Sequence, residues 1–328
     1  MNNYVLEVKE GQSNSAGTKA KEDITYFLKE KNFKDISIQI PSNRIMRVLF
    51  GKKIVSKSLR DVNSGTFVFQ YPMYSRVISN YALNNLSNKK EIEKILVIHD
   101  VESLRLNKDE HDAVAKEIGF FNKFDKVISH NQKMTDWLLS NGLAVPVKNL
   151  EIFDYNNPQK IIKNSYEKSI VFAGNLSKSK FLNKLNIKSN VYIMGPGASD
   201  EYPNNIHYEG MFTPEEVPAH LGKGFGLVWD GDSIDECNGL FGEYMKFNNP
   251  HKVSLYLSSG IPVIIWSKSA MADFISKNKL GIVVDSLNNI DSVLDGVTEE
   301  KYNFLKKNVE KVAVDLRSGK YIYNAVVD

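Results

Sequence analysis

Short apolar runs alternate with amphipathic stretches along nearly the whole chain. In the first half, five apolar runs resemble strands, at residues 4–8, 36–40, 66–72, 94–100 and 126–130. Between them, segments such as 18–30 and 109–121 carry apolar residues at helical spacing. Strands that alternate with helices are typical of a parallel sheet covered by helices. The pattern therefore predicts an α/β fold.

The same pattern restarts after a short polar segment at residues 155–166. Six further strands are expected at residues 169–175, 191–197, 206–212, 225–232, 262–266 and 281–285. Two similar series predict two doubly wound, Rossmann-like domains with a cleft between them. We expect an N-terminal domain at 1–155, a C-terminal domain at 156–305, and a helical segment at 306–328 that crosses back to the first domain.

Length and composition agree with a two-domain globular protein. The chain has 328 residues and a net charge of +3, and its lysines are interleaved with acids without a block of basic residues, which argues against a nucleic-acid-binding face. A single cysteine, Cys237, excludes an internal disulfide and a cysteine-rich metal cage. The sequence shows no signal peptide and no apolar run near the ~20 residues that span a bilayer. We expect a cytoplasmic protein, and leave open peripheral membrane contact through an amphipathic face.

The segment 248–266 combines an Asn-Asn-Pro turn, a helix and a strand. Pro250 suits the first position of the helix, and Asn248 or Asn249 can cap its free amides. Lys252 then lies in the first turn, where the helix dipole disfavours a cation by ~0.3–1 kcal/mol. A bound diphosphate would favour both the lysine and the free amides. The alternative is a lysine that extends into solvent from a well-capped helix.

Other loops that follow expected strands of the second half carry weaker indications. The strand near residue 170 is followed by a glycine and a polar loop, in which Lys178 and Lys180 are available to a phosphate. Met211 and Phe212 follow the strand near residue 207, where an apolar edge can stack on a base. Methionine and phenylalanine are more often core residues, so these two indicate a nucleotide only in combination with Lys252.

In the first half, the loop after the first strand contains Gly11 and Gly17 and leads into a helix. It matches neither the Walker A pattern nor the Gly-x-Gly-x-x-Gly fingerprint. Two interpretations stay open: a loop that contacts substrate, or an ordinary loop with Thr18 as the helix cap.

His99 and Asp100 end a strongly apolar strand, where catalytic groups collect in α/β folds. A histidine with a nearby carboxylate can act as a general base. The alternative is that Asp100 caps the next helix while His99 packs.

Asp230 and Asp232 form an Asp-x-Asp pair after another strand, and two such carboxylates can hold Mg²⁺ or Mn²⁺. The surrounding residues are also typical of a polar turn, which we favour. The six histidines show no pair at ligand spacing, so we expect no metal.

Several segments resemble a known family. "PHKVSLYLSSGIPVII" is similar to the Lys, helix, Tyr, Gly-x-Pro-Val segment of retaining glycosyltransferases with the GT-B fold. More narrowly, "FGLVWDGDSIDECNG", "EYMKFNNPHKVSLYLSSGIPVI", "VFAGNLSKS" and "VIHDVESLR" resemble the glucosyltransferases of the serine-rich repeat adhesin glycosylation pathway of streptococci and lactobacilli. Relatives of these enzymes are often labelled β-1,6-galactofuranosyltransferases.

The resemblance implies a nucleotide-sugar site. In the second domain it places Lys252 on the donor phosphates, Asn248 and Asn249 at the adjoining turn, Gly174, Asn175 and Lys178 beside the nucleotide, and Met211 and Phe212 along the uracil. In the first domain it places Gly17 and Thr18 against the reacting sugar. Many GT-B enzymes bind the ribose with a Glu three residues after this lysine, whereas this chain has Leu255, so ribose recognition must come from elsewhere.

The resemblance also implies a reaction. It implies transfer of glucose from UDP-glucose to GlcNAc-modified Ser or Thr of a serine-rich adhesin, with no metal or other cofactor, by a homotetramer. Lys252 would be the main catalytic residue, with His99 and Asp100 ranked below it. The alternatives are a galactofuranosyltransferase with a polysaccharide or lipid-linked acceptor and a non-catalytic nucleotide-sugar-binding partner of another transferase. An NAD-dependent oxidoreductase is disfavoured because the glycine fingerprint is missing.

Overall fold

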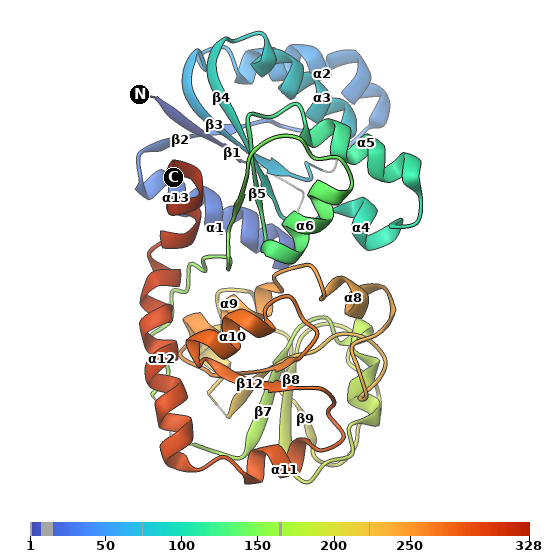
Figure 1. Cartoon of the computed structure of the whole chain (residues 1–328), viewed down its shortest axis with the longest axis vertical. Coiled ribbons are helices and arrows are strands. Elements are labelled where there is room, and N and C mark those ends of the chain that lie inside the picture. The colour runs from blue at the N-terminus through green and yellow to red at the C-terminus, as the bar shows by residue number, and fades with distance from the viewer. Residues whose placement is uncertain (1, 8–15, 74, 164–165, 223) are drawn as a thin grey trace. The chain divides into compact units, whose positions relative to one another are not determined.

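A computed structural model describes residues 2–7, 16–73, 75–163, 166–222 and 224–328. The chain divides into two compact units. Unit 1 comprises Met1–Leu150 and Gly319–Asp328, and unit 2 comprises Glu151–Ser318. Each unit contains a parallel β-sheet with helices packed on it (Figure 1). The predicted α/β class is therefore confirmed.

Unit 1 contains a six-stranded parallel sheet in the order β2-β1-β3-β4-β5-β6. Its strands are β1 (Asn3–Glu7), β2 (Phe33–Ser37), β3 (Ser64–Tyr71), β4 (Glu91–Ile98), β5 (Lys126–Ser129) and β6 (Val147–Asn149). Its helices are α1 (Ala16–Glu30), α2 (Arg44–Ser58), α3 (Arg76–Ser87), α4 (Glu102–Leu106), α5 (His111–Phe121), α6 (Gln132–Ser140) and α13 (Lys320–Val327). The strand order reverses between β1 and β3, so the carboxyl ends of these two strands form a topological switch point.

Unit 2 contains a second six-stranded parallel sheet, in the order β12-β11-β10-β7-β8-β9. Its strands are β7 (Ser169–Ala173), β8 (Asn190–Met194), β9 (Ile206–Tyr208), β10 (Phe225–Val228), β11 (Val263–Trp266) and β12 (Gly281–Val284). Its helices are η1 (Leu176–Lys178), η2 (Lys180–Lys184), α7 (Val217–His220), α8 (Gly239–Tyr244), α9 (His251–Ser258), α10 (Ala272–Asn278), α11 (Ile290–Asp295) and α12 (Glu299–Arg317). This is the Rossmann strand order, with its switch point between β7 and β10.

Three elements differ from the sequence prediction, and one of them is the short strand β6, which was not predicted. The strand expected at 36–40 is β2, which begins at Phe33 because its register pairs Phe33 with Asn3 of β1. The continuous helical segment expected near the C-terminus is divided into α12 and α13 at Gly319, whose φ is 70°. A Cβ atom on Gly319 would lie 2.5 Å from the Phe27 side chain, so glycine is required there. Among the described residues, no helix has both the length and the apolar character needed to cross a bilayer.

Helix α9 is fixed to the sheet of unit 2 by Tyr256. The ring lies against β10 at Gly226, where a Cβ atom would be 2.3 Å from Cγ of the tyrosine. The hydroxyl oxygen accepts a hydrogen bond of 2.8 Å from the backbone N–H of Ala173, the last residue of β7. Tyr256 is fully buried, so water does not compete for either contact. Lys252 lies one turn earlier on the same side of α9, and Tyr256 therefore determines its position.

We predict that Gly226→Ala lowers the free energy of unfolding by ~1–3 kcal/mol, because the added methyl group overpacks against Tyr256. The buried Trp229 and Trp266 report the unfolding of this unit in a urea titration followed by fluorescence. Gly296→Ala is the matched control, because the nearest atoms to its Cβ would be 3.5 Å away. Equal unfolding free energies for the two variants would contradict the packing argument.

Candidate active site

The carboxyl ends of β7 and β10 are neighbours at the switch point of the unit 2 sheet. Gly174 directly follows β7, and Trp229 and Asp230 directly follow β10. α/β proteins bind ligands in the crevice beyond the carboxyl ends of strands at such a point. These two loops are therefore the first place to look for a nucleotide site.

The side chain of Lys252 lies at both loops. Its Nζ is 2.8 Å from Oδ1 of Asp230 and 4.5 Å from the centre of the Phe172 ring. A Cβ atom on Gly174 would be 2.8 Å from Cε of Lys252, so the lysine also lies directly against this loop. The side chains of Lys252 and Asp230 are 17% and 23% exposed, so the pair is shielded from bulk water but still accessible to a ligand. The lysine turns toward the sheet instead of extending into solvent.

Asp230 explains how a cation is tolerated in the first turn of a helix. The helix dipole disfavours Lys252 at this end by ~0.3–1 kcal/mol. A carboxylate at 2.8 Å offsets that cost and holds the ammonium in one place. The sequence indicated Asp230 only as a turn residue or metal ligand, and its pairing with Lys252 was missed because 22 residues separate the two.

The start of α9 differs from the predicted cap. The helix begins at His251, so Pro250 is at the N-cap position, and within the described chain no side chain caps the helix through a hydrogen bond. Asn249 instead donates from Nδ2 to the carbonyl oxygen of Glu151 at 3.0 Å, and Oδ1 of Asn248 is buried without a hydrogen-bond partner among the described residues. The prediction that either asparagine caps α9 is therefore wrong, because the carbonyl of Glu151 engages one amide and the turn buries the other.

Glycines bring the loops after β7, β8 and β9 close together. Gly195 has a φ of 136°, and a Cβ atom there would be 1.8 Å from the carbonyl oxygen of Gly174. Its N–H donates to the carbonyl oxygen of Gly210 at 2.9 Å, and Gly210 directly precedes Met211 and Phe212. The loops predicted to contact the phosphates and the base are thus linked through Gly195. The role of Gly195 was not predicted, although Gly-Pro-Gly directly after a strand is a sequence signal for a close backbone approach.

Asn175 and Lys178 follow Gly174 and have local partners. Oδ1 of Asn175 accepts a hydrogen bond of 3.1 Å from the N–H of Ser177 and caps the short helix η1. Nζ of Lys178 lies 4.4 Å from the centre of the Phe241 ring. Their contacts with a nucleotide stay predictions.

Met211 and Phe212 lie in the loop after β9. Met211 is 68% exposed, so it is not a core residue. The Phe212 ring stacks on His220 with centroids 3.7 Å apart and an interplanar angle of 13°. Their role along a uracil stays a prediction.

Gly17 and Thr18 lie in the first turn of α1, which begins at Ala16. Thr18 is therefore inside the helix, and the interpretation that it caps α1 is wrong. Gly17 is exposed and Thr18 is partly exposed. Both follow β1 at the switch point of the unit 1 sheet, whereas Gly11 lies outside the described residues.

His99 and Asp100 follow β4 and have different partners. Nε2 of His99 is 2.8 Å from Oε1 of Gln70, whose amide group donates to two other buried groups. Oε1 of Gln70 must therefore accept, so His99 carries its proton on Nε2. Asp100 forms an ion pair with Arg105 at 2.8 Å. These contacts do not join His99 to Asp100, and a general-base role for the two residues stays a prediction.

The Asp-x-Asp segment is organised by contacts within the protein. Asp230 pairs with Lys252, and the N–H of Asp232 donates to Oδ1 of Asn238 at 2.8 Å. In the part of the chain that the structure describes, no three His, Cys, Asp or Glu residues are grouped so that they could hold a metal ion. Burial raises the pKa of the nearby Cys237 thiol, which keeps it uncharged and unreactive.

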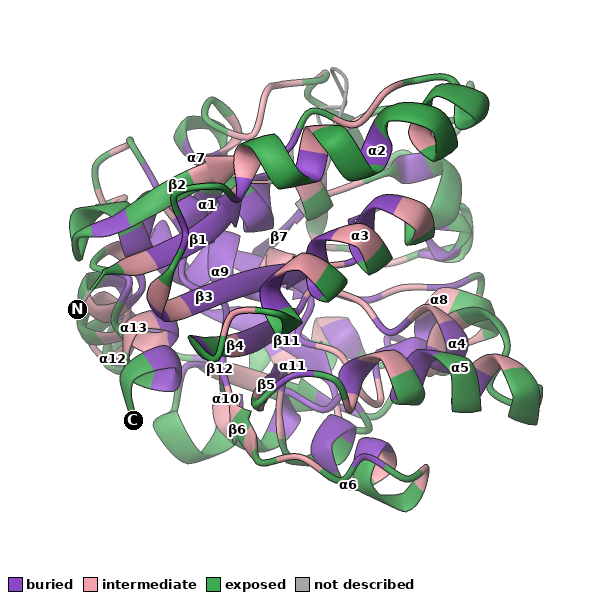
Figure 2. Ribbon diagram, turned by 90° about the horizontal axis from the view of Figure 1, so that it is seen from above, coloured by how far each residue is buried: buried purple, intermediate pink, exposed green. Residues whose placement is uncertain are grey.

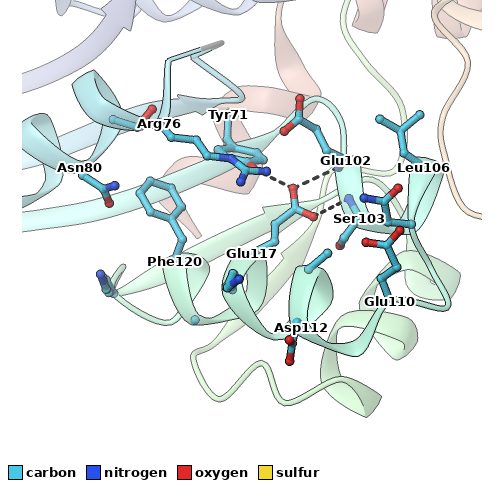
Figure 3. Close-up of a pocket in the computed structure, with 16 residues that line it drawn as sticks. Tyr71, Arg76, Asn80, Glu102, Ser103, Leu106, Glu110, Asp112, Glu117 and Phe120 are labelled. Atoms are coloured by element: carbon cyan, nitrogen blue, oxygen red, sulfur yellow. Dashed lines mark hydrogen bonds between the residues drawn. The ribbon is translucent and has the colours of Figure 1, made fainter. Parts of the chain in front are cut away.

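Unit 1 contains a pocket of about 710 Å³ near the carboxyl ends of β3 and β4 (Figure 3). At its centre, the Glu117 carboxylate accepts hydrogen bonds from the Tyr71 hydroxyl at 2.7 Å and from the backbone N–H groups of Glu102 and Ser103 at 3.0 and 2.7 Å. Burial raises the pKa of Glu102, and the negative charge of Glu117 raises it further. The Glu102 side chain therefore takes up a proton more readily than an exposed glutamate.

The remaining lining of this pocket combines charge with an aromatic surface. Figure 3 shows the Arg76 side chain extending toward Tyr71 and Glu117, with the Phe120 ring beside it. Rings, a guanidinium group and carboxylates suit a ligand that presents both hydroxyl groups and an apolar face. Arg76 and Glu117 were not predicted as site residues, because they lie in separate helices and far from His99 along the chain.

Comparisons with known proteins identify relatives over the full length of the chain. The family model described as glucosyltransferase 3-like, N-terminal domain, matches residues 2–152, and the corresponding C-terminal domain matches residues 170–328. The chain is 31% identical to "Beta-1,6-galactofuranosyltransferase WbbI" of Escherichia coli K12, over 97% of this chain and 95% of the relative. It is 26% identical to "Glucosyltransferase 3" of Streptococcus gordonii, over 94% and 92% of the two chains.

Solved structures share the fold at low identity. The apo structure of OtsA aligns with a TM-score of 0.60 at 9% identity, covering 99% of this chain and 98% of OtsA. An alpha-glucosyltransferase in complex with UDP aligns with a TM-score of 0.57 at 12% identity, covering 99% and 100% of the two chains. These likenesses and the two parallel sheets show that the fold is GT-B.

His130 directly follows β5, at the carboxyl edge of the unit 1 sheet. Its Nε2 is 3.1 Å from the carbonyl oxygen of Ile98, to which the neutral ring donates. Complete burial lowers the pKa of His130 to about 4. The unfolded chain therefore binds a proton at a higher pH than the folded chain, so protonation favours unfolding.

We predict that unit 1 loses stability as the pH falls from about 6.5 toward 4. The contribution of His130 between pH 7 and pH 5 is ~2 kcal/mol. Urea titrations at several pH values measure the slope of the unfolding free energy against pH. His130→Gln should reduce this slope. His111→Gln is the control, because His111 is exposed and its replacement should leave the slope unchanged. An unchanged slope in His130→Gln would contradict the assignment of this pH dependence to His130.

Proposed function

Because this chain belongs to the glucosyltransferase 3-like family and is a UDP-sugar-dependent glycosyltransferase of the GT-B fold, we propose that it transfers glucose from UDP-glucose to N-acetylglucosamine linked to Ser or Thr of a serine-rich protein. One observation carries the proposal. Lys252, in the first turn of α9, is held by Asp230 against Gly174 at the switch point of the unit 2 sheet. The likeness to "Glucosyltransferase 3" of Streptococcus gordonii supports glucose as the donor sugar.

In the proposed mechanism, Lys252 stabilises the departing UDP. An ammonium group has three N–H donors, of which Asp230 uses one, so two can reach the diphosphate. The backbone amides in the first turn of α9 add partial positive charge at the same place. Negative charge grows on the diphosphate as the bond to the sugar breaks, so these interactions strengthen in the transition state and lower the barrier. Asp230 keeps the lysine in position before the donor binds.

The unit 1 pocket is the proposed acceptor site. Glu102 and Arg76 can form hydrogen bonds with sugar hydroxyls, while Phe120 offers a ring for the apolar face of a sugar. This assignment is consistent with a neutral, hydroxyl-rich acceptor. The serine-rich adhesin, the homotetramer and the cytoplasmic location stay predictions.

A second candidate function is galactofuranosyl transfer. The 31% identity to the Escherichia coli galactofuranosyltransferase over 97% of the chain favours it. The Lys252 mechanism applies equally, because it acts on the diphosphate and not on the sugar ring. The two candidates therefore differ in the donor sugar and the acceptor alone.

We predict that Lys252→Ala lowers kcat/KM for UDP-glucose about 10²- to 10³-fold, because the departing diphosphate loses its nearest cation. Initial rates of UDP release with a GlcNAc-bearing peptide as acceptor measure the effect. Lys252→Arg should retain part of the activity because the positive charge remains.

The control for this prediction is Lys301→Ala, which removes an exposed lysine on α12 of the same unit and should leave kcat/KM unchanged. Melting temperatures of all three variants check that they are folded. Unchanged turnover in Lys252→Ala would refute the mechanism.

We predict that UDP-glucose raises the melting temperature equally with and without Mn²⁺, because Asp230 is already paired with Lys252. A thermal-shift series with UDP-glucose and UDP-galactofuranose, in Mn²⁺ and in EDTA, tests both points. Stabilisation by UDP-galactofuranose alone would establish the second candidate donor. A shift that requires Mn²⁺ would contradict metal-independent donor binding.

A further inference from the structure

Helix α2 of unit 1 exposes an unusual concentration of apolar side chains. Of the 15 large hydrophobic residues that are exposed in the described structure, five lie within residues 45–50. Ile45 and Leu49 are each 66% exposed, and they lie four residues apart on one face of the helix. Figure 2 shows the first turns of α2 as almost continuously exposed. Single exposed apolar residues are ordinary, whereas a contiguous group usually marks a binding surface.

The opposite face of α2 packs well, so this exposure does not reflect a loose helix. Gly51 and Val55 are buried, and a Cβ atom on Gly51 would be 2.7 Å from the Ile78 side chain of α3. The helix begins with a side-chain cap, in which Oδ1 of Asn43 accepts from the N–H of Ile45 at 2.8 Å. The buried face and the cap therefore hold the apolar residues outward.

The charged side chains of α2 itself all have one sign. Residues 44–60 contain six Lys or Arg residues and no Asp or Glu, so the expectation that the chain has no block of basic residues is wrong for this segment. Arg47 binds the backbone carbonyls of Pro41 and Ser42 at the start of the helix. Lys52, Lys53 and other basic residues are exposed to solvent next to the apolar group. We define the outer face of α2 by its exposed apolar and basic residues: Ile45, Met46, Val48, Leu49, Phe50, Lys52 and Lys53.

We propose that the outer face of α2 binds the surface of an anionic lipid membrane. A helix with a large exposed apolar group and exclusively basic charged neighbours suits the interface of such a bilayer, where the side chains enter the acyl region and the lysines contact anionic headgroups. A second copy of the chain is a poorer partner. Two outer faces related by a two-fold axis would bring like charges together.

This inference goes beyond the proposed function and rests on different residues. It requires neither Lys252 nor a donor sugar, and it places the enzyme at a membrane surface. A transferase held at a bilayer meets acceptors attached to lipids or delivered to the membrane. The experiments can therefore show sugar transfer without membrane binding, or membrane binding without sugar transfer.

Vesicle flotation of the full chain without any sugar nucleotide tests the proposal. One set of vesicles is phosphatidylcholine alone, and the other contains about one-third phosphatidylglycerol. We expect binding to the anionic vesicles, weak binding to the neutral ones, and loss of binding at high salt. The double variants Ile45→Ser/Leu49→Ser and Lys52→Gln/Lys53→Gln should each reduce the partition coefficient roughly tenfold or more.

Matched controls change exposed residues of the same types on α12. Phe304→Ser/Val314→Ser and Lys307→Gln/Lys311→Gln should bind vesicles within about twofold of the unaltered protein, since these residues are exposed but lie on another helix. Melting temperatures and turnover of a soluble acceptor should be unchanged in every variant.

Three results would overturn the proposal. The first is absent or equal binding of the unaltered protein to the two kinds of vesicle. The second is vesicle binding by the α2 variants that matches the unaltered protein. The third is a smaller particle mass of Ile45→Ser/Leu49→Ser in light scattering without any vesicle binding, which would assign the outer face to contact between copies of the chain.

Discussion

The contact of Tyr256 with Gly226 determines where the reactive end of α9 lies. A flat ring can lie directly on β10 because Gly226 has no side chain, and the tyrosine oxygen then meets the last amide of β7. The helix is thereby fixed against the two strands whose order defines the switch point. Lys252, one turn earlier, follows from this placement and comes to lie against the loops after both strands. One buried packing contact thus positions the cation on which the proposed chemistry depends.

The positive charge of Lys252 is balanced by the carboxylate of Asp230. A lysine at the start of a helix is unfavourable by itself. Asp230 compensates for this cost and uses only one of the three N–H donors of Lys252, so two are left for a ligand. The side chain is shielded enough for its interactions to be strong and exposed enough for a diphosphate to reach it. The glycines after β7 and β8 matter for the same reason, since a side chain at Gly174 would displace the lysine and one at Gly195 would separate the loops. The two units present different groups: unit 2 holds an ion pair at its switch point, whereas the pocket of unit 1 combines carboxylates and a guanidinium group with aromatic rings.

Sequence patterns predicted the α/β class and most strands, because these depend on local periodicity and on residues close together in the chain. They failed where a distant group decided the outcome. Asn249 does not cap α9 because the carbonyl of Glu151, 98 residues away along the chain, engages its amide. The C-terminal helical segment is divided at Gly319 because Phe27 occupies the space that a side chain would need. Neither contact can be predicted from the residues that surround Asn249 or Gly319 in the sequence.

By itself, the sequence determined the order of strands and helices, the helical spacing between Tyr256 and Lys252, and the resemblance to a glycosyltransferase family. Tertiary structure alone decided which side chains meet. It paired Lys252 with Asp230 instead of leaving the lysine in solvent, brought His99 to Gln70 and Asp100 to Arg105, and assembled a pocket around Glu117 from helices that are distant in sequence. The physical reason is that hydrophobic periodicity specifies which face of an element is buried, whereas hydrogen bonds and ion pairs depend on distances that are set only when the elements pack.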